Sequence, residues 1–321
     1  MSAGADAGAR VAVVGGGVIG LSIALELAAR GSTVTVYADR AVRDTVSAVA
    51  GAVWFPFEAA PAERVRGWSV ATLPRMVAMA SDPASGVRMR EGIVVVRTED
   101  VDAAWTTWID GVREAAPADL PAGALGGFAV ELPVIDMPVY LDHLERLCGE
   151  AGVEIVRRRV DALEELVADA IVVASGSRSV DLLGPDPEVF PIRGQVVRLE
   201  NPGLERWYLD GDNPAGLTYV LPRTTDVVCG GSADVGRVDE EFDDDEGERI
   251  LARARALVPQ LADARVISRG VGLRPGRTEV RLERVPGHAT PMVACYGHGG
   301  AGVTTSWGCA FEVADLVELA I

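Results

Sequence analysis

The sequence predicts an α/β fold, α+β overall, in which a domain built on a parallel sheet is interleaved with a mostly antiparallel β domain. Three observations support this prediction. The beginning of the chain follows the order strand, glycine turn, helix, strand. Two further blocks with helix and strand patterns lie near the middle and at the end of the chain. The stretches between these blocks alternate polar and apolar residues with the period of two that is typical of strands.

The N-terminal unit carries the first of these patterns. Residues 11–14 form an apolar run, a glycine-rich turn follows, and apolar positions from Ile19 onward predict a helix that ends near Gly31. Residues 34–37 form the next apolar run and predict a second strand. Strand, turn, helix and strand in this order are the first βαβ unit of a Rossmann-like domain.

Two later blocks complete this domain. Residues 137–152 predict a helix opened by Pro138, and residues 153–156 and 170–174 predict strands. The last thirty or so residues predict a strand, a glycine turn and a helix. The dinucleotide-binding domain is therefore expected to be discontinuous and to consist of residues 1–52, 137–190 and 285–321.

The intervening segments predict the second domain. Strand patterns occur in "GIVVVRTED" from Gly92, "RGQVVRLEN" from Arg193 and "LTYVLPRTTDVVCGG" from Leu217. They assign residues 53–136 and 191–284 to a mostly antiparallel domain. The acidic run "DEEFDDDEGE" from Asp239 is expected to be a solvated loop and helix start, not a metal site.

Composition restricts the function classes. The chain has 321 residues, 49% of them hydrophobic, and a formal net charge of −17, which disfavours nucleic acid and anionic membranes as partners. It contains no lysine, and this excludes a pyridoxal-phosphate enzyme and a P-loop nucleotide site, because each requires that residue. No apolar run reaches the roughly 18 residues of a membrane span and no signal peptide is evident, so we expect a cytoplasmic protein that acts on a small molecule.

The four cysteines suggest no metal site. Cys148, Cys229, Cys295 and Cys309 have no CxxC spacing, so neither a zinc site nor a dithiol redox motif is expected. Buried, inert thiols are the expectation, and the spacing leaves their disulfide status open.

The glycine turn predicts a dinucleotide site. In "GGGVIG", Gly15 permits the tight turn, Gly17 lets the backbone approach a pyrophosphate, and Gly20 allows close helix packing. Asp39 follows at the end of the second predicted strand, where a carboxylate binds a ribose hydroxyl and disfavours the 2′-phosphate of NADP. NAD and FAD both remain possible on these residues alone.

Further motifs point to one family. The segments "VYADR", "WFPF", "RGQ", "YVLP", "GLRPGR", "RLER" and "YGHGGAGVTTSWGCA" occur in this order between residue 11 and about residue 316. Together they resemble the D-amino acid oxidase family of FAD enzymes, and the C-terminal segment is the most specific of them. The resemblance implies that the Rossmann-like domain binds FAD non-covalently and that the second domain binds the substrate.

The resemblance also implies the cofactor-binding residues. The glycine turn with Val18 and Ile19 would hold the pyrophosphate, and Asp39 and Arg40 would lie near the adenosine ribose. Val160 would meet the adenine through backbone atoms, and the loop at His298 would lie against the flavin ring. The remaining implied positions are Thr45, Ser47, Gly51, Ala52, Ser175, Gly176, Arg281, Gly299, Gly300, Gly302, Val303 and Thr304.

The implied substrate site centres on Arg274, which matches the carboxylate-binding arginine of the family, and on Tyr219, which matches the tyrosine that hydrogen-bonds the same carboxylate. Val53, Phe55, Leu209, Leu221 and Ala301 would line the side-chain pocket. Ala301 stands where a tyrosine is common and Phe55 where a glutamine is common, so neutral, apolar D-amino acids are expected. Hydride would pass from Cα to flavin N5, and O2 would reoxidise the flavin to give hydrogen peroxide, with the 2-oxo acid and ammonia as the other products.

Alternatives remain open. The second hypothesis is a D-aspartate oxidase or glycine oxidase of the same superfamily. An acidic substrate needs another cation in the pocket, and Arg223 and Arg237 are the candidates. An NAD-dependent dehydrogenase or a non-catalytic flavoprotein is less favoured. The resemblance implies a homodimer, and "VELAI" lacks a peroxisomal Ser-Lys-Leu signal, which agrees with the cytoplasm.

Overall fold

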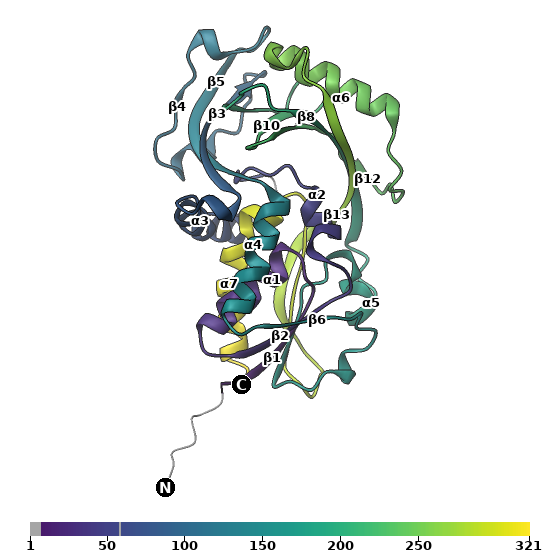
Figure 1. Ribbon diagram of the computed structural model, residues 1–321. Helices are drawn as coiled ribbons and strands as arrows, with labels where there is room; N and C mark the ends of the chain where they lie inside the picture. The colour runs from purple at the N-terminus through teal and green to yellow at the C-terminus, as the bar shows by residue number, and fades with distance from the viewer. Residues whose placement is uncertain (1–7, 58) are drawn as a thin grey trace.

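One continuous β-sheet runs through both halves of the molecule (Figure 1). The computed structural model describes residues 8–57 and 59–321. In the order in which they pair, the strands are β4 (Arg113–Glu114), β5 (Gly126–Ile135), β3 (Val87–Val96), β9 (Trp207–Asp210), β10 (Thr218–Pro222), β11 (Asp226–Gly230), β8 (Val189–Glu200), β13 (Val266–Val285), β14 (Met292–His298), β7 (Ala170–Val173), β1 (Arg10–Val14), β2 (Thr33–Ala38) and β6 (Glu154–Arg157), while β12 (Asp234–Val235) also pairs with β8.

The parallel half confirms the predicted βαβ unit. Strands β14, β7, β1, β2 and β6 pair in parallel, with Val11 opposite Val34 on β2 and opposite Ala170 on β7. The fully apolar β7 is buried along its whole length, as expected for a strand inside a parallel sheet. The helices of this half are α1 (Val18–Ala29), α4 (Met137–Glu150) and α7 (Gly302–Glu318), and they lie together in the lower half of Figure 1.

The antiparallel half lies above it in Figure 1. Its sheet packs one face against α6 (Asp244–Leu257), where Val197 and Val220 meet Ile250 of the helix in a buried apolar cluster. The Asp243 side chain accepts a hydrogen bond from the Glu246 N–H at 3.0 Å and so caps α6. The acidic run is therefore a loop and helix start, as predicted.

Strand β13 belongs to both halves. It is 20 residues long; the part from Val266 to Arg277 pairs with β8, and the part from Gly276 onward pairs with β14. The predicted boundaries at 190/191 and 284/285 lie at the beginning of β8 and at the end of β13. Because the backbone hydrogen bonds of β13 cross the division, the two halves share one sheet. The assignment of segments to two domains remains a proposal.

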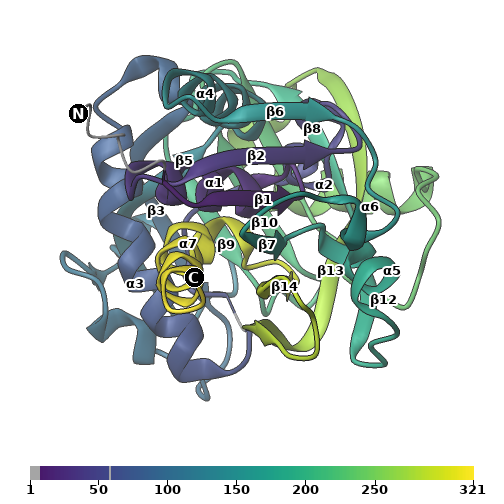
Figure 2. The same ribbon diagram turned by 90° about the horizontal axis from the view of Figure 1, so that it is seen from below.

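Helix α3 (Ala62–Met79) is the main element that the sequence analysis missed. The alternation of residues 53–136 predicted strands and turns there, but α3 packs against α7, as Figure 2 shows from below. The packing is close: the Gly308 N–H donates to Thr72 Oγ1 at 2.9 Å, and a Cβ at Gly308 would lie 2.3 Å from the Trp68 backbone. The contact surface of α3 includes Ser69 and Thr72, so its apolar stripe is interrupted and its period is hard to detect in the sequence.

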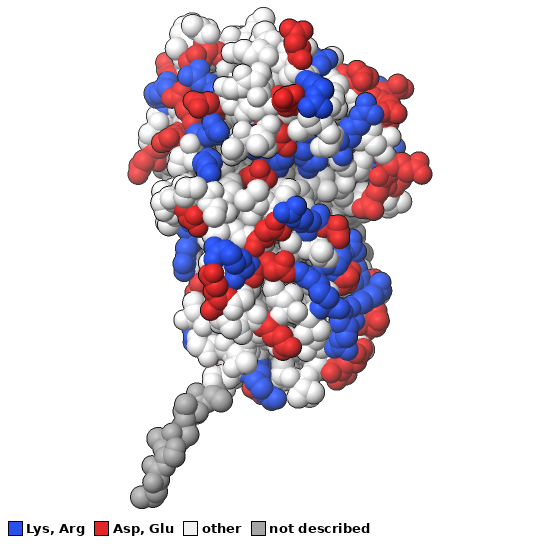
Figure 3. All heavy atoms as spheres, viewed as in Figure 1, with Lys and Arg blue, Asp and Glu red and all other residues white. Residues whose placement is uncertain are grey.

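The surface carries both signs of charge. On the face drawn in Figure 3, arginines and carboxylates are intermixed, and acidic side chains gather at the edge where α6 and its preceding loop lie. No helix in the described part of the chain is long and apolar enough to cross a membrane. Two short helices, α2 (Val46–Val49) and α5 (Ser179–Leu183), complete the fold.

Candidate flavin and substrate site

The glycine turn joins β1 to α1 in the way that the sequence predicted. Gly15 has φ +132°, and a Cβ there would lie 2.3 Å from the Ala174 carbonyl oxygen at the end of β7. A Cβ at Gly20 would lie 1.9 Å from the Gly15 carbonyl oxygen. Both positions therefore exclude any side chain, and the turn lies close to the carboxyl ends of neighbouring parallel strands, where ligands of such sheets bind.

The N-terminus of α1 is suited to a pyrophosphate. Gly17 is its N-cap and has no side chain that could cap the helix, and the first turn contains no acidic residue. Among the N–H groups there, that of Val18 donates to Ser47 Oγ at 3.2 Å, and a Cβ at Gly17 would meet only this hydroxyl. Free N–H groups and the positive end of the helix dipole favour an anion, so these residues fit the diphosphate of a dinucleotide.

Asp39 follows β2 and is held by two arginines. Arg40 Nη2 lies 3.1 Å and Arg178 Nη1 3.0 Å from its carboxylate. The hydrogen bond from Arg40 lowers the pKa of Asp39, and Arg178 adds to this effect while burial opposes it. A carboxylate that stays ionised is a good acceptor for a ribose hydroxyl. Arg178 was not predicted; it comes two residues after Gly176, and only the fold brings it to Asp39.

The segment after Asp39 leads from the nucleotide end toward the large sheet. Thr45 Oγ1 donates to the Val42 carbonyl at 2.6 Å, and the Ile135 N–H donates to the Ala52 carbonyl at 2.9 Å. A Cβ at Gly51 would lie 2.8 Å from Leu221 Cδ1 and 3.4 Å from Tyr219 Cε2. Gly51 thus brings the predicted cofactor segment into contact with the predicted substrate residues.

Among the residues that the structure describes, the loop between β14 and α7 is another place where N–H groups have no acceptor. Ala301 is the N-cap of α7, and this helix end also has no capping side chain and no acid in its first turn. Cβ atoms at Gly300 and Gly302 would make only ordinary contacts, with nearest atoms at 4.0 and 3.7 Å. The arrangement can stabilise negative charge on a flat ring laid against the loop.

Thr304 has a partner inside the protein. Its hydroxyl donates to the Phe55 carbonyl at 2.9 Å, and the Phe55 N–H lies 3.4 Å from the same oxygen. The side chain therefore ties α7 to the segment that follows Ala52. A cofactor contact of Thr304 remains a prediction, as do those of Val303 and Gly299.

Arg274 and Tyr219 meet on one face of the antiparallel sheet. Arg274 Nη1 donates to the Ser232 carbonyl at 3.1 Å, and the guanidinium lies across Gly194, where a Cβ would be 2.2 Å from Nη1. The Tyr219 ring lies against Gly230, where a Cβ would be 2.2 Å from Cζ. Burial raises the pKa of Tyr219, and the charge and hydrogen bond of Arg274 oppose the rise.

Glycines make this meeting possible. Gly194 in "RGQ" and Gly230 in "CGG" leave the space that the two side chains fill, and neither was predicted as a site residue. Arg274 Cδ would lie 4.0 Å from a Cβ at Gly300, so the carboxylate-binding candidate adjoins the β14–α7 loop. Residues from four distant parts of the sequence thus form one site.

The predicted pocket walls are mostly buried. Leu209 pairs with Tyr219 across β9 and β10, and Leu221 contacts the position of Gly51. Phe55 is half-buried, and its ring lies 5.4 Å from Phe57 and 5.0 Å from Trp105 in edge-to-face contacts. Val53 forms a bridge to Val134, and Ala301 is 1% exposed. These side chains offer apolar surface without charge.

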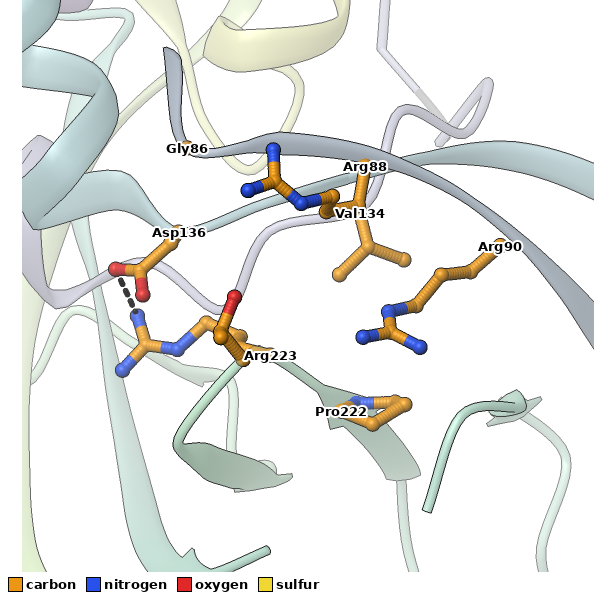
Figure 4. A pocket seen from close by; sticks show the side chains of 8 residues that line it. Gly86, Arg88, Arg90, Val134, Asp136, Pro222 and Arg223 are labelled. Carbon is orange, nitrogen blue, oxygen red and sulfur yellow. Dashed lines mark ion pairs between the residues drawn. The ribbon is translucent and has the colours of Figure 1, made fainter. Parts of the chain in front are cut away.

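The structure shows which groups the two candidate cations, Arg223 and Arg237, pair with. Arg223 forms ion pairs with Asp226 and, at 3.3 Å, with Asp136, and it lines a small hollow with Arg88 and Arg90 (Figure 4). Arg237 is paired with Asp239 at 2.6 Å on the surface. Neither guanidinium is free of carboxylate partners.

Arg198 is a cation that the sequence analysis did not consider. It occupies the same face of β8 as Gly194, and its Nη2 donates to the Val49 carbonyl at 3.2 Å. Burial and the charge of Arg223 lower the pKa of Arg198, while Asp226 and Asp136 oppose this effect. Arg198 and Arg223 thus share the two aspartates, and Arg88 and Arg90 line the same hollow as Arg223.

Two other predicted cofactor residues have partners of their own. Arg281 Nη1 donates to the Tyr296 hydroxyl at 2.7 Å, and Arg281 Nε pairs with Glu283 at 2.7 Å. Val160 is 3% exposed and packs in a small apolar cluster beside β1 and β7. Their contacts with FAD remain predictions.

His298 turns its ring away from solvent toward two thiols. Its Nε2 lies 3.8 Å from Cys295 Sγ and 3.6 Å from Cys309 Sγ. The Cys309 thiol lowers the pKa of Cys295 by hydrogen bonding, and His298 adds to this while burial opposes it. All four cysteines are buried and free, so none forms a disulfide.

Comparisons with known proteins show what this chain is similar to. A D-amino-acid oxidase of Rubrobacter xylanophilus is 48% identical over 319 residues, 98% of this chain and 97% of its own. A D-aspartate oxidase of Homo sapiens is 35% identical over 330 residues, 97% of this chain and 95% of its own. A crystal structure of glycine oxidase from Geobacillus kaustophilus has the same fold, with a TM-score of 0.81 at 21% identity, covering 97% of this chain and 95% of that one.

The family model described as FAD dependent oxidoreductase (DAO) matches residues 10–316, almost the whole chain. The two uncapped helix ends, the ionised Asp39 and the glycines between them fit the diphosphate, ribose and ring of FAD. The glycine turn alone left NAD and FAD open, and the family match decides for FAD. The chain belongs to the DAO family of FAD-dependent oxidoreductases.

Proposed function

We propose that the protein oxidises D-amino acids with neutral, apolar side chains to 2-oxo acids, with release of ammonia and hydrogen peroxide. The meeting of Arg274 and Tyr219 beside the β14–α7 loop is the observation that carries this proposal. It is supported by the D-amino-acid oxidase that is 48% identical to this chain.

Arg274 and Tyr219 would bind the substrate carboxylate. A guanidinium donates two parallel N–H bonds to a carboxylate, and this fork fixes both position and orientation. Because the pKa of Tyr219 is raised above its usual value, its hydroxyl stays protonated at neutral pH and can donate to the same carboxylate. The substrate would be anchored by one end, with its Cα beside the loop.

The other residues would position the substrate and exclude water, and they would not transfer protons. Bound FAD supplies the acceptor for the hydride of Cα and passes the electrons to O2. The free N–H groups at the start of α7 would stabilise the negative charge that accompanies this transfer. The imino acid product is hydrolysed by water without a dedicated side chain, and no catalytic acid or base is assigned.

Neutral side chains are favoured because the two candidate cations already have aspartate partners. Arg223 and Arg237 are held by aspartates, and the charges of Asp226 and Asp136 also act on Arg198. A second substrate carboxylate would have to compete with Asp136 and Asp226 for these guanidinium groups, which is unfavourable in a buried site.

The test is a peroxide-coupled assay of the purified yellow protein with D- and L-amino acids. We expect activity with D-alanine and larger apolar D-amino acids, and none with the L-enantiomers. Arg274→Gln should lower kcat/KM by at least about 100-fold, whereas Arg265→Gln, a change of an exposed arginine, should change it less than about twofold. Peroxide release from L-alanine, or a normal kcat/KM in the Arg274 variant, contradicts the proposal.

D-aspartate oxidation is the second candidate, and Arg198 is the observation that favours it. A kcat/KM for D-aspartate above that for D-alanine, lost in Arg198→Gln, would establish it. Glycine oxidation is tested in the same panel. A cytoplasmic location and a homodimer remain predictions, to be checked by cell fractionation and by light scattering after size exclusion.

A further inference from the structure

Three ligand-type side chains meet in the core behind the β14–α7 loop. They are Cys295 on β14, His298 at the end of the same strand, and Cys309 in the second turn of α7. Their Sγ and Nε2 atoms all lie within 4.8 Å of one another. The three residues are 1%, 4% and 0% exposed, so the group is closed off from solvent.

The separations match those of a metal site. With zinc bonds of about 2.3 Å to sulfur and 2.0 to 2.1 Å to nitrogen, tetrahedral angles place sulfur about 3.5 Å from nitrogen and two sulfurs about 3.8 Å apart. The two observed sulfur–nitrogen distances are 3.6 and 3.8 Å. A small inward movement of the three side chains is enough to reach bonding distances.

The present partners of the imidazole are weak. Within residues 8–57 and 59–321, the contacts of His298 Nε2 that qualify as hydrogen bonds all go to sulfur. A thiol is a poor hydrogen-bond partner, and a buried ring nitrogen that has no better one is undercompensated for its loss of water. A metal ion would replace these weak contacts by strong bonds.

We propose that Cys295, His298 and Cys309 form a binding site for Zn²⁺ that clamps the β14–α7 loop from behind. Two thiolates and a neutral imidazole balance the charge of the ion, so the loaded site is neutral in an apolar core. Binding releases the two thiol protons to solvent, and the three side chains supply three of the ligands of the ion. The site lies behind the flavin loop and does not depend on which amino acid is oxidised.

The sequence did not reveal this site because its ligands have no recognised spacing. Cys295 and Cys309 are separated by the whole loop and lie on a strand and a helix. Only the packing of α7 on β14 brings them together. The expectation of no metal site rested on spacing alone.

Metal content of the holoenzyme tests the proposal. The protein is produced in zinc-supplemented medium, washed with a weak chelator, and analysed for zinc and flavin. We expect about one zinc per flavin in the natural protein and less than about one tenth in Cys295→Ser and Cys309→Ser. Cys148→Ser and Cys229→Ser remove buried thiols elsewhere and should leave the ratio unchanged.

X-ray absorption at the zinc edge examines the natural protein itself, so the test stands even if a variant does not fold. The expected shell has two sulfurs at about 2.3 Å and one nitrogen at about 2.0 Å. Loading should also raise Tm, and this rise should be absent in Cys295→Ser. Zinc below about one tenth per flavin in the natural protein, a shell of oxygen and nitrogen only, or full zinc content in a folded Cys295→Ser overturns the proposal.

Discussion

The space at Gly194 controls the position of the Arg274 guanidinium. A Cβ at residue 194 would lie 2.2 Å from Nη1 and 2.4 Å from Cζ of Arg274. Non-bonded heavy atoms prefer separations of about 3.5 Å or more, so Gly194→Ala must displace the guanidinium by roughly 1.3 Å. The backbone of Gly194 is not among the positive-φ glycines, so alanine itself is tolerated there.

We expect Gly194→Ala to damage substrate binding without unfolding the protein. A misplacement of about 1 Å costs up to about 100-fold in rate, and a lost hydrogen bond to a charged group costs about 1.5 to 3 kcal/mol. The kcat/KM for D-alanine should therefore fall by about 10- to 100-fold, mainly through KM. Because the displaced group is the end of a flexible side chain, the free energy of unfolding should change by less than about 1 kcal/mol.

A matched control lies on the neighbouring strand. Gly272 pairs with Gly194, and a Cβ there would meet Val49 at 3.4 Å, an ordinary contact. Gly272→Ala should leave KM within about twofold of the natural value. In an Arg274→Ala background, Gly194→Ala should have no additional effect, because both changes act on one group. If Gly194→Ala retains its flavin and its KM stays within about twofold, the assigned carboxylate site is wrong.

Four other predictions concern the cofactor, the substrate and the stability of the fold. Tyr219→Phe should raise KM by about tenfold and leave kcat within about threefold, since one hydrogen bond to the carboxylate is lost; a larger fall in kcat than in kcat/KM argues against this role. Asp39→Asn should raise the Kd of FAD by about tenfold, measured by flavin fluorescence on dilution. An unchanged Kd would show that Asp39 does not bind the ribose. Gly308→Ala should lower the free energy of unfolding by more than about 2 kcal/mol, because its Cβ would lie 2.3 Å from the α3 backbone. Gly67→Ala in α3, where a Cβ would have nothing within 4 Å, should be neutral or stabilising. Equal urea midpoints for the two variants would refute this packing. Burial raises the pKa of Cys229 to about 12, so the folded state holds this proton more tightly than the unfolded state, and the free energy of unfolding should fall as pH rises above about 8.5. Cys229→Ala should make the free energy of unfolding, measured by urea titration, fall less steeply with pH. An equally steep fall in Cys229→Ala contradicts the burial of this thiol as the cause.

The local elements could be predicted because their signals lie within short windows. The apolar run 11–14, the three glycines and the alternation in "RGQVVRLEN" each depend on neighbours a few residues away, and the structure has a strand or a turn at each. Element ends differ by one or two residues, as for α1, which begins at Val18 and ends at Ala29. Helix α3 was missed because its buried stripe includes serine and threonine.

The amino-acid sequence by itself determined the βαβ unit, the dinucleotide turn with Asp39, and, through the order of its motifs, the family. It also named Arg274 and Tyr219. Only the tertiary structure decided how distant segments meet. Strand β13 joins both halves, and Gly194 and Gly230 make room for the Arg274 and Tyr219 side chains. Aspartates pair with Arg223. The same packing gathers Cys295, His298 and Cys309. The physical reason is that periodicity and turn chemistry are local, whereas these contacts depend on strand register and helix packing between residues far apart in the chain.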